Sequence, residues 1–321
     1  MTERFGVSAG TLSLLGLSRA RNRELPTTAH FMVGERCTHS CAFCAQARDS
    51  KAPPHHLSRV TWPEKLWDEI ETPLSGAIAG GLVKRVCIQT VETPGGTESA
   101  LQLTRKVRSL SPDVQISICV APESVSRVEA FFRAGASRVG LPVDAVTPET
   151  YRRVKGGDLE RAWAVLEKAS SLWPGRISTH FICGLGETEE EMVLALDRAR
   201  TLGITVALFA FTPVKGTLME HDAPPDVSSY RRVQIAAYFL KMGGSKDSFE
   251  FRDGKIVRIS TDDPAFLGRL WEGKPFETSG CPDCNRPYYN ERPGRRMMNF
   301  PRSLTEKEVR ECIAESGLFR G

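Results

Sequence analysis

RVCIQTVETPGGTESALQLTRKVRSLSPDVQISICV, which spans residues 85–120, holds two short apolar runs separated by a longer amphipathic segment. The runs at 85–90 and 114–120 are rich in Val and Ile, residue types that favour β-strands. Between them, residues 97–110 follow a turn with Pro94 and two glycines and carry apolar side chains at helical spacing. The stretch therefore predicts a strand–helix–strand unit whose two strands are parallel.

The same alternation continues from about residue 28 to residue 260. The pattern predicts further strands at 29–34, 137–143, 176–182 and 204–211, and further helices at 64–80, 123–135, 158–173, 188–202 and 227–243. Six such units, with an extra strand at 255–260, predict an α/β protein built as a full or partial (β/α) TIM-type barrel of parallel strands. The expected parts are an N-terminal extension (1–27), the barrel (28–262) and an irregular, cysteine-containing C-terminal tail (263–321) with a last helix at 304–316.

Polar segments follow the predicted strands, at the end of the barrel where the chemistry of this fold is found. A loop with three cysteines directly follows the strand at 29–34, and four later segments follow other strands: 89–96, 143–149, 184–190 and 212–217. We expect all of them to converge on one mouth of the barrel.

The composition is that of a globular protein, with 40% hydrophobic and 26% charged residues among 321. No apolar run reaches the roughly 18 residues that a membrane span needs. The N-terminus is a poor secretory signal because Glu3 is acidic and the apolar stretch is broken. We therefore expect a cytoplasmic protein without a membrane partner.

The net charge of +4 is small, and basic and aromatic residues are not interleaved as in single-strand binders, so no nucleic-acid partner is expected. Much of the positive charge could come from the tail, which carries Arg292, Arg295, Arg296 and Arg302. Two interpretations remain open for this stretch: a solvated basic face, or a docking surface for an acidic partner.

Nine cysteines in a chain without a secretory signal favour metal or redox chemistry over disulfides. Cys37, Cys41 and Cys44 form a C-x3-C-x2-C loop. Three thiolates on one short loop can hold three corners of a cubane cluster and leave one iron open, whereas a structural zinc site needs four protein ligands. His39 lies within the loop, and we interpret it as a loop residue rather than as a fourth ligand.

This spacing, with Phe43 just before the third cysteine, resembles the signature of the radical S-adenosylmethionine (SAM) superfamily. The resemblance covers roughly residues 28–260. It implies a 4Fe–4S cluster whose open iron binds the amino and carboxylate groups of SAM, and a 5′-deoxyadenosyl radical that takes hydrogen from an unactivated carbon.

The same resemblance implies cofactor contacts from other segments. Gly184 and Glu187 lie in a segment similar to the family's adenine-contacting fifth-strand motif, and Arg161 resembles an arginine that meets the methionyl carboxylate. Asp144 falls where relatives place a polar group near the ribose or the substrate. Phe43 is the last of the residues that the resemblance implies as cofactor contacts.

The run CAQAR at 44–48 resembles the sequence that follows the cluster in biotin synthase and its relatives. Cys87 and Cys119 end the second and third predicted strands, where biotin synthase places two ligands of a second, sulfur-donating cluster. Arg258 resembles the arginine ligand of that cluster.

The last cysteine ligand of that second cluster does not match. Its equivalent position is about Ser178, and Cys183 is displaced along the strand. Cys87 and Cys119 therefore keep two interpretations, as cluster ligands or as small buried hydrophobic residues.

The tail contains a C-x2-C turn, Cys281 and Cys284, between glycine and proline residues. Such a turn presents two thiolates to one metal. A second iron–sulfur cluster, a zinc ion, and free thiols or a redox pair all remain open, as does a ligand role for Cys312.

The tail and the CAQAR run together resemble the biotin-synthase-like subunits of the two-component, archaeal-type lipoyl synthases. This resemblance implies a sulfurtransferase that places one of two sulfur atoms on an octanoyl chain, with a second iron–sulfur cluster as the sulfur donor. The implied partners are a second radical SAM subunit, an octanoylated acidic carrier protein or peptide, and an electron donor such as ferredoxin or flavodoxin.

Two alternatives compete with sulfur insertion. One is a biotin-synthase-related or other radical SAM enzyme, methylating or rearranging its substrate, with zinc or an electron relay at Cys281 and Cys284. The other is a non-catalytic assembly protein or iron–sulfur carrier.

Overall fold

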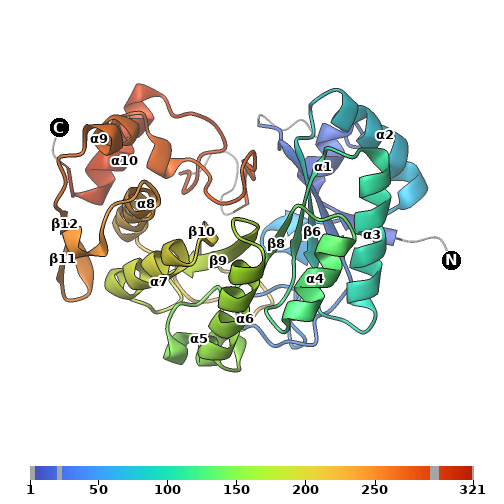
Figure 1. Ribbon diagram of the computed structural model, residues 1–321, viewed down its shortest axis with the longest axis horizontal. Helices are drawn as coiled ribbons and strands as arrows, with labels where there is room; N and C mark the ends of the chain where they lie inside the picture. The colour runs from blue at the N-terminus through green and yellow to red at the C-terminus, as the bar shows by residue number, and fades with distance from the viewer. Residues whose placement is uncertain (1–3, 20–23, 290–295, 320–321) are drawn as a thin grey trace.

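The computed structural model describes residues 4–19, 24–289 and 296–319. Its centre is an eight-stranded sheet with the strand order β10-β9-β8-β7-β6-β2-β1-β5 (Figure 1). The strands are β1 (Arg4–Val7), β2 (Thr28–Val33), β5 (Glu64–Leu66), β6 (Arg85–Thr90), β7 (Gln115–Cys119), β8 (Arg138–Gly140), β9 (Ile177–Cys183) and β10 (Thr205–Ala210). All neighbours from β2 to β10 pair in parallel, as the alternating sequence predicts.

Helices cover the outer side of this curved sheet. Each connection between two successive parallel strands contains at least one helix, which packs on that side. They are α2 (Trp67–Ala79), α3 (Gly96–Leu110), α4 (Val125–Arg133), α5 (Pro148–Lys155), α6 (Leu159–Leu172) and α7 (Glu189–Thr201). Alternate strand residues such as Val86, Ile88, Ile116 and Ile118 are fully buried against them. The main apolar core therefore lies between the sheet and the helices.

The parallel strands do not close into a ring. At one end of the set, β10 pairs with β9 alone, and at the other β2 pairs with the antiparallel strand β1. The prediction of a full or partial barrel is confirmed in its partial form. The N-terminal extension contributes β1 and helix α1 (Ala9–Leu14) to this sheet and its cover.

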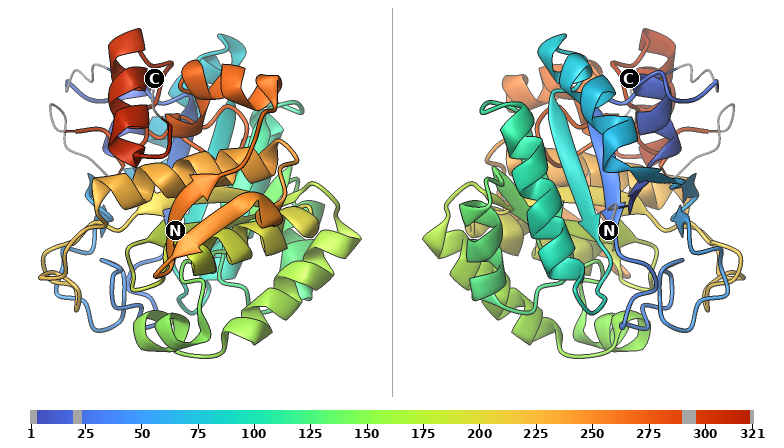
Figure 2. Two further views of the ribbon diagram at one scale, coloured as in Figure 1. Left: turned by 90° about the vertical axis from the view of Figure 1, so that its left-hand side faces the viewer. Right: turned by 90° about the vertical axis from the view of Figure 1, so that its right-hand side faces the viewer.

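The expected extra barrel strand at 255–260 is wrong. Residues Lys255–Ile259 form β12, which pairs with β11 (Phe249–Arg252) in a separate antiparallel hairpin. Gly254 supplies the positive φ of the tight turn between them, which favours a local hairpin over a long-range parallel pairing. Figures 1 and 2 show this hairpin beside α8 (Val227–Lys241), away from α3 and α4.

The C-terminal tail runs along the open side of the barrel. After α9 (Pro264–Trp271), the backbone N–H of Leu208 on β10 donates to Ser279 Oγ at 2.9 Å. The backbone N–H of Thr27, just before β2, donates to Asn285 Oδ1, also at 2.9 Å. The tail therefore bridges the two strands that the sheet leaves apart, before helix α10 (Glu306–Ser316).

Mostly polar residues face the inside of the barrel in two rows that follow the strand register. One row is His30, Cys87, Ser117 and Arg138, and the next is Gln89, Cys119, Gly140 and Ser178. A barrel whose centre is only a core is filled with branched apolar residues. The polar rows mark this interior as a place for ligands.

Within the described ranges, no helix has the length and apolar character needed to cross a membrane.

Candidate functional site

The three-cysteine loop leaves the sheet directly after β2. Gly34 has a φ of 90°, and a Cβ there would lie 2.9 Å from the Val91 carbonyl oxygen, so the exit from the strand needs glycine. Backbone hydrogen bonds then close the loop on itself, from Cys37 N to Gln46 O at 2.7 Å and from Arg48 N to His39 O at 2.8 Å. The loop therefore has a defined shape independent of any bound group.

Gln46, the residue that the CAQAR run shares with biotin synthase, fastens this loop. Its side chain is buried, its Oε1 accepts from the Arg36 backbone N–H at 3.2 Å, and its Nε2 donates to the His56 carbonyl at 2.7 Å. The shared glutamine thus has a positioning role that the motif alone does not reveal.

The thiols of the loop receive backbone hydrogen bonds suited to thiolates. The N–H groups of His39 and Gln46 point at the Sγ atoms of Cys37 and Cys44, each at 3.4 Å. Loss of water around the thiols raises the pKa of Cys41 to about 11 and that of Cys44 to about 12. At neutral pH these two are therefore neutral thiols unless a bound cation stabilises the thiolates.

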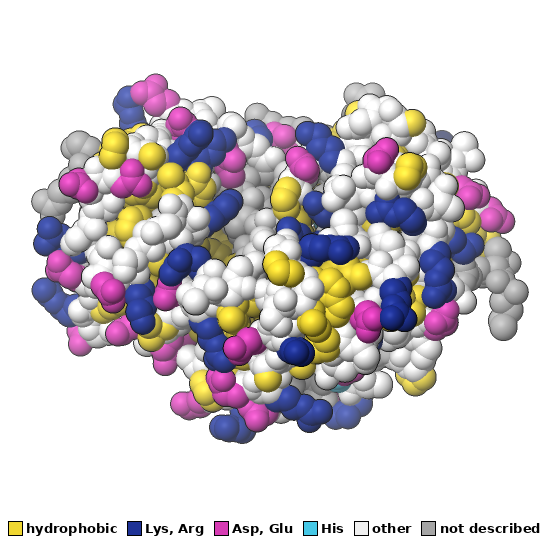
Figure 3. Space-filling model, viewed as in Figure 1, with side chains coloured by type: hydrophobic (Ala, Val, Ile, Leu, Met, Phe, Trp, Pro, Cys, Tyr) yellow, Lys and Arg dark blue, Asp and Glu magenta, His cyan; other side chains and the backbone are white. Residues whose placement is uncertain are grey.

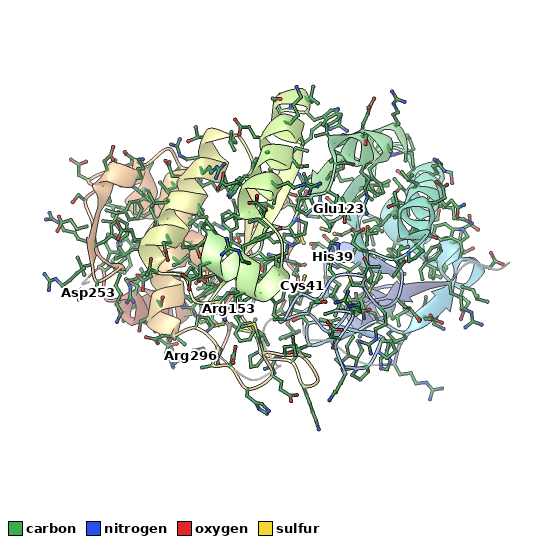
Figure 4. All side chains as sticks on the ribbon, turned by 90° about the horizontal axis from the view of Figure 1, so that it is seen from below. His39, Cys41, Glu123, Arg153, Asp253 and Arg296 are labelled. Carbon is green, nitrogen blue, oxygen red and sulfur yellow. The ribbon has the colours of Figure 1, made fainter. Side chains whose placement is uncertain are left out.

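The imidazole of His39 pairs with a carboxylate of another segment. Its Nε2 lies 3.2 Å from Glu123 Oε1, and Figure 4 shows the pair beside Cys41. This contact agrees with its interpretation as a loop residue.

Asp144 lies beside the cysteine loop and is held by a lysine that the sequence did not single out. Lys155, the last residue of α5, places Nζ 2.7 Å from Asp144 Oδ2 and 2.7 Å from the Pro142 carbonyl. Burial alone would lower the pKa of Lys155, but the charges of Asp144 and Cys41 raise it. The positive charge next to Cys41 thus comes from a short helix without a recognisable motif.

The segment around Gly184 and Glu187 is a tight turn at the end of β9. Both Glu187 oxygens accept backbone N–H groups, from Gly184 at 2.7 Å and from Leu185 at 3.0 Å. Burial raises the pKa of Glu187. Arg153 on α5 (labelled in Figure 4), also missed by sequence reasoning, donates to the Leu185 carbonyl.

The two other predicted cofactor contacts lie in different surroundings. Phe43 is partly buried and packs against the main core. Arg161 is exposed on the first turn of α6, whose preceding Glu160 binds Arg198 at 3.0 Å. Neither residue is linked to the Gly184–Glu187 turn by a contact that the described part of the chain shows.

The second group of cysteines lies inside the barrel. Ser117 Oγ is 3.7 Å from Cys281 Sγ, and His30 Nε2 is 4.0 Å from Cys284 Sγ. Gln89 Nε2 donates to Cys87 Sγ at 3.1 Å. The tail turn and the barrel strands therefore present their thiols to one interior.

Ser178 on β9 lies at the end of the second row of interior residues. It lies across Gly140 from Cys119 in the register, and a Cβ on Gly140 would be 3.1 Å from Cys119 Sγ and 3.2 Å from Ser178 Oγ. Cys183 ends β9 on the opposite face of the strand, where it is buried in the main apolar core. Arg258 is outside the barrel, exposed on the β11–β12 hairpin and paired with Glu250 at 3.1 Å, so its resemblance to a cluster ligand is wrong.

Two imidazoles in the interior are neutral. Burial, with a smaller effect of Arg286, lowers the pKa of His30 to about 4. Burial likewise lowers the pKa of His180 to about 4, and its Nε2 lies 3.8 Å from Cys119 Sγ. The interior therefore favours neutral groups except where a cation is fixed by direct contacts.

A cavity of about 1180 Å³ opens on the side of the barrel between β2 and the chain after β10. The basic side chains on its wall outnumber the carboxylates of Glu24 and Glu220; they are Lys51, Arg59, Lys215 and Arg286. Its size exceeds the few hundred to about 1,000 Å³ that a typical small-ligand site needs. The cavity can therefore admit an extended group from outside.

The two arginines of the basic tail that the structure describes form ion pairs within the chain. Arg296 binds Glu315 at 3.3 Å, and Arg302 binds Glu308 at 2.8 Å and Glu24 at 3.3 Å. Arg292 and Arg295 lie outside the described residues. On the face shown in Figure 3, Lys and Arg side chains are interspersed with Asp and Glu.

Comparison with known proteins agrees with this geometry. The profile of the Radical SAM superfamily matches residues 31–199, more than half of the 321-residue chain. The apicoplast lipoyl synthase of Plasmodium yoelii yoelii is 26% identical over 253 residues, covering 74% of this chain and 46% of that protein. The mitochondrial lipoyl synthase of Uncinocarpus reesii is 25% identical over 275 residues, covering 81% and 60%. The chain thus spans about half of the length of these relatives.

Solved structures share the fold at low sequence identity. The hydrogenase maturase HydG of Carboxydothermus hydrogenoformans superposes with a TM-score of 0.53 at 17% identity, covering 91% of this chain and 66% of that one. Methylornithine synthase superposes with a TM-score of 0.51 at 17% identity, covering 67% and 62%. Because the superfamily profile matches more than half of its residues, the chain belongs to the radical SAM superfamily, whose cofactors are a 4Fe–4S cluster and S-adenosylmethionine.

Proposed function

We propose that this radical SAM enzyme is a sulfurtransferase that inserts sulfur at an unactivated C–H bond of an octanoyl chain carried on a protein, one of the two sulfur insertions of lipoyl synthesis. The observation that carries the proposal is the second group of thiols, which lies inside the barrel whose first parallel strand, β2, leads into the loop of Cys37, Cys41 and Cys44. The similarity to lipoyl synthases supports the same reaction class.

The three loop thiols fit a cubane cluster by their chemistry. They are soft donors on one self-bonded loop, two of them already receive backbone N–H groups, and a three-ligand set leaves one iron for SAM. Bound there, the cluster and SAM would supply a radical able to remove a hydrogen atom from the substrate.

The surrounding residues bind and orient the cofactor in this proposal. The Gly184–Glu187 turn would contact the adenine, Asp144 would lie near the ribose or the substrate, and Phe43 and Arg161 are the remaining candidate contacts, Arg161 for the methionyl carboxylate. Lys155 fixes the Asp144 carboxylate by an ion pair at 2.7 Å. The buried pair and the packed helices also keep water from the radical.

The side cavity is the proposed entrance for the octanoyl chain. Its wall carries Lys51, Lys215 and Arg286, which complement an acidic carrier protein or peptide. The proposal also includes a second radical SAM subunit for the other sulfur, an electron donor such as ferredoxin or flavodoxin, and a cytoplasmic location.

Mass spectrometry of an octanoylated carrier peptide tests the proposal. The peptide is incubated anaerobically with reduced enzyme and SAM, with and without a candidate partner subunit. A mass gain of one sulfur atom at one carbon is expected. Hydrogen exchange alone, a methyl gain or a rearranged product would contradict sulfur insertion and favour the alternative radical reactions.

A further inference from the structure

The side cavity adjoins the barrel interior at two of its lining residues. His30 on β2 lines the cavity, and its Nε2 lies 4.0 Å from Cys284 Sγ. Tyr289 in the tail also lines it, and its ring centre lies 5.3 Å from that of Phe209 on β10. Among the described residues, Cys284 and Phe209 are not themselves on the cavity wall. His30 and Tyr289 therefore belong to the layer that separates the cavity from the interior.

Tyr289 is the first of a row of side chains that leads into the barrel. Its ring contacts Phe209, whose ring centre lies 5.1 Å from that of His180. His180 Nε2 in turn lies 3.8 Å from Cys119 Sγ. Both ring pairs have the tilted or edge-on geometry that aromatic side chains favour. The row therefore fills the space between the cavity and Cys119, and Tyr289 is its outermost member.

The tail backbone reaches this position through unusual dihedral angles. Arg286 and Tyr288 have φ values of 35° and 58°, in the left-handed region that residues with a Cβ rarely adopt. Arg286 Cζ lies 4.2 Å from the centre of the Phe209 ring, and its guanidinium donates to the Ser279 carbonyl at 2.6 Å. Phe209 thus contacts the tail both before and at Tyr289. Strained backbone of this kind persists where surrounding contacts fix it, often around a ligand.

A short hairpin holds the tail from the other side of the cavity. Its strands are β3 (His56–Leu57) and β4 (Val60–Thr61). Ser58, between the two strands, lines the cavity and donates Oγ to the Tyr289 carbonyl at 3.3 Å. The hairpin and the tail therefore meet at Tyr289.

The cavity offers charge at its exposed parts and apolar surface at its buried parts. Lys51 and Lys215 are exposed. Trp62 and Val214, two apolar residues of the wall, are buried. Exposed cations suit an acidic partner, and a buried apolar wall suits a hydrocarbon chain. A chain that passes the cations would meet the ring of Tyr289 before it met Phe209.

We propose that Tyr289 closes the inner end of the side cavity and sets how far an acyl chain extends towards the barrel interior, so that it determines the chain length accepted. The identity of the ligand as an acyl chain rests on the proposed function. The position of the ring does not, because it follows from the contacts with the cavity and with Phe209. A pocket that fixes the end of a hydrocarbon chain discriminates by about tenfold or more for each methylene group that does not fit.

Peptides acylated on one lysine with perdeuterated hexanoyl, octanoyl, decanoyl or dodecanoyl chains test the proposal with the reconstituted holoenzyme. Transfer of deuterium into 5′-deoxyadenosine reports hydrogen abstraction and does not depend on sulfur insertion. We expect the wild type to favour the octanoyl peptide. Tyr289→Ala should raise the rate with the decanoyl peptide, relative to the octanoyl peptide, by at least about tenfold. An unchanged ratio overturns the inference.

Two further variants keep the test valid if Tyr289→Ala does not fold, which circular dichroism checks. Tyr289→Phe retains the ring and should retain the wild-type preference. Tyr289→Trp introduces a larger ring and should shift the preference from the octanoyl to the hexanoyl peptide. Tyr238→Ala, on α8 and outside the cavity wall, is the control for the loss of a tyrosine ring. The same preference in Tyr289→Trp as in the wild type contradicts the inference.

These readouts separate the inference from the proposed function. The expected shift in chain length without sulfur in the product would refute the proposed function and leave the inference standing. Sulfur insertion with an unchanged ratio in Tyr289→Ala would refute the inference alone. Absence of deuterium transfer from all four peptides in the wild type would refute both, because the chain would then not act on acyl groups.

Discussion

The two cysteine groups of this chain differ in how they are assembled. The loop thiols lie within eight consecutive residues, 37–44, and the backbone hydrogen bonds of that loop fix its shape. The interior thiols come from β6, β7 and the tail, and only the tertiary structure brings them together. A local group can be recognised from its spacing, whereas a group made of distant parts needs the fold.

The largest expected effect is the loss of SAM cleavage when a cysteine of the three-cysteine loop is replaced. Cys41→Ala should abolish formation of 5′-deoxyadenosine from SAM, because two thiolates cannot hold a cubane with one open iron. The product is measured by chromatography after reduction. Cys312→Ala is the matched control, and cleavage persisting in Cys41→Ala at the control rate would break the comparison.

The next prediction separates the two groups by activity. Cys281→Ala should lose sulfur insertion into an octanoylated peptide while still forming 5′-deoxyadenosine, since the loop site does not contain Cys281. Both products are quantified in one reaction. Loss of both SAM cleavage and sulfur insertion in Cys281→Ala would contradict separate roles for the two cysteine groups.

A third prediction concerns the support that the fold gives to the loop site. Lys155→Met leaves the buried Asp144 carboxylate without its cation, and removing one partner of a buried pair costs about 3–5 kcal/mol. Urea unfolding of the metal-free protein measures the loss. The double variant Asp144→Asn with Lys155→Met should recover most of it, and equal losses in both variants would contradict a charge-based role.

The smallest effect tests how the tail is held. The hydrogen bond from Arg302 lowers the pKa of Glu308 to about 2, so the stability that this carboxylate contributes is present above pH 4.5 and is lost as the pH falls towards 2. Glu308→Gln should therefore reduce the free energy of unfolding by up to about 1 kcal/mol at pH 7 and by less at pH 3. A loss that does not change with pH would point to packing instead.

The strands and the loop site could be predicted because their signals are local. The predicted strands overlap all six parallel strands of the structure. They could be found because strand residues that are buried against the helices are apolar and form short apolar runs in the sequence. The spacing of Cys37, Cys41 and Cys44 likewise predicts a single short loop that can hold one cluster.

The parts that could not be predicted depend on tertiary contacts. Residues 255–260 have the composition of a strand, but their partner is the neighbouring β11, and hydropathy does not specify a partner. Lys155 and Arg153 lie on a short helix that the pattern did not reveal, and nothing in the sequence shows that they reach Asp144 and Leu185.

One signal for the interior site was available in the sequence. Cys87 and Gln89, like Ser117 and Cys119, alternate with fully buried apolar residues on strands that should be apolar on both faces. This alternation predicts a polar barrel interior. It does not predict that Cys281 and Cys284 enter it.

Electron paramagnetic resonance of the reduced, anaerobically reconstituted protein, recorded with and without SAM, tests the central claim most directly. The account predicts two cluster signals, about eight irons per chain if both are cubanes, and a change on adding SAM in only one of them. A single signal, or two signals that both ignore SAM, would contradict it.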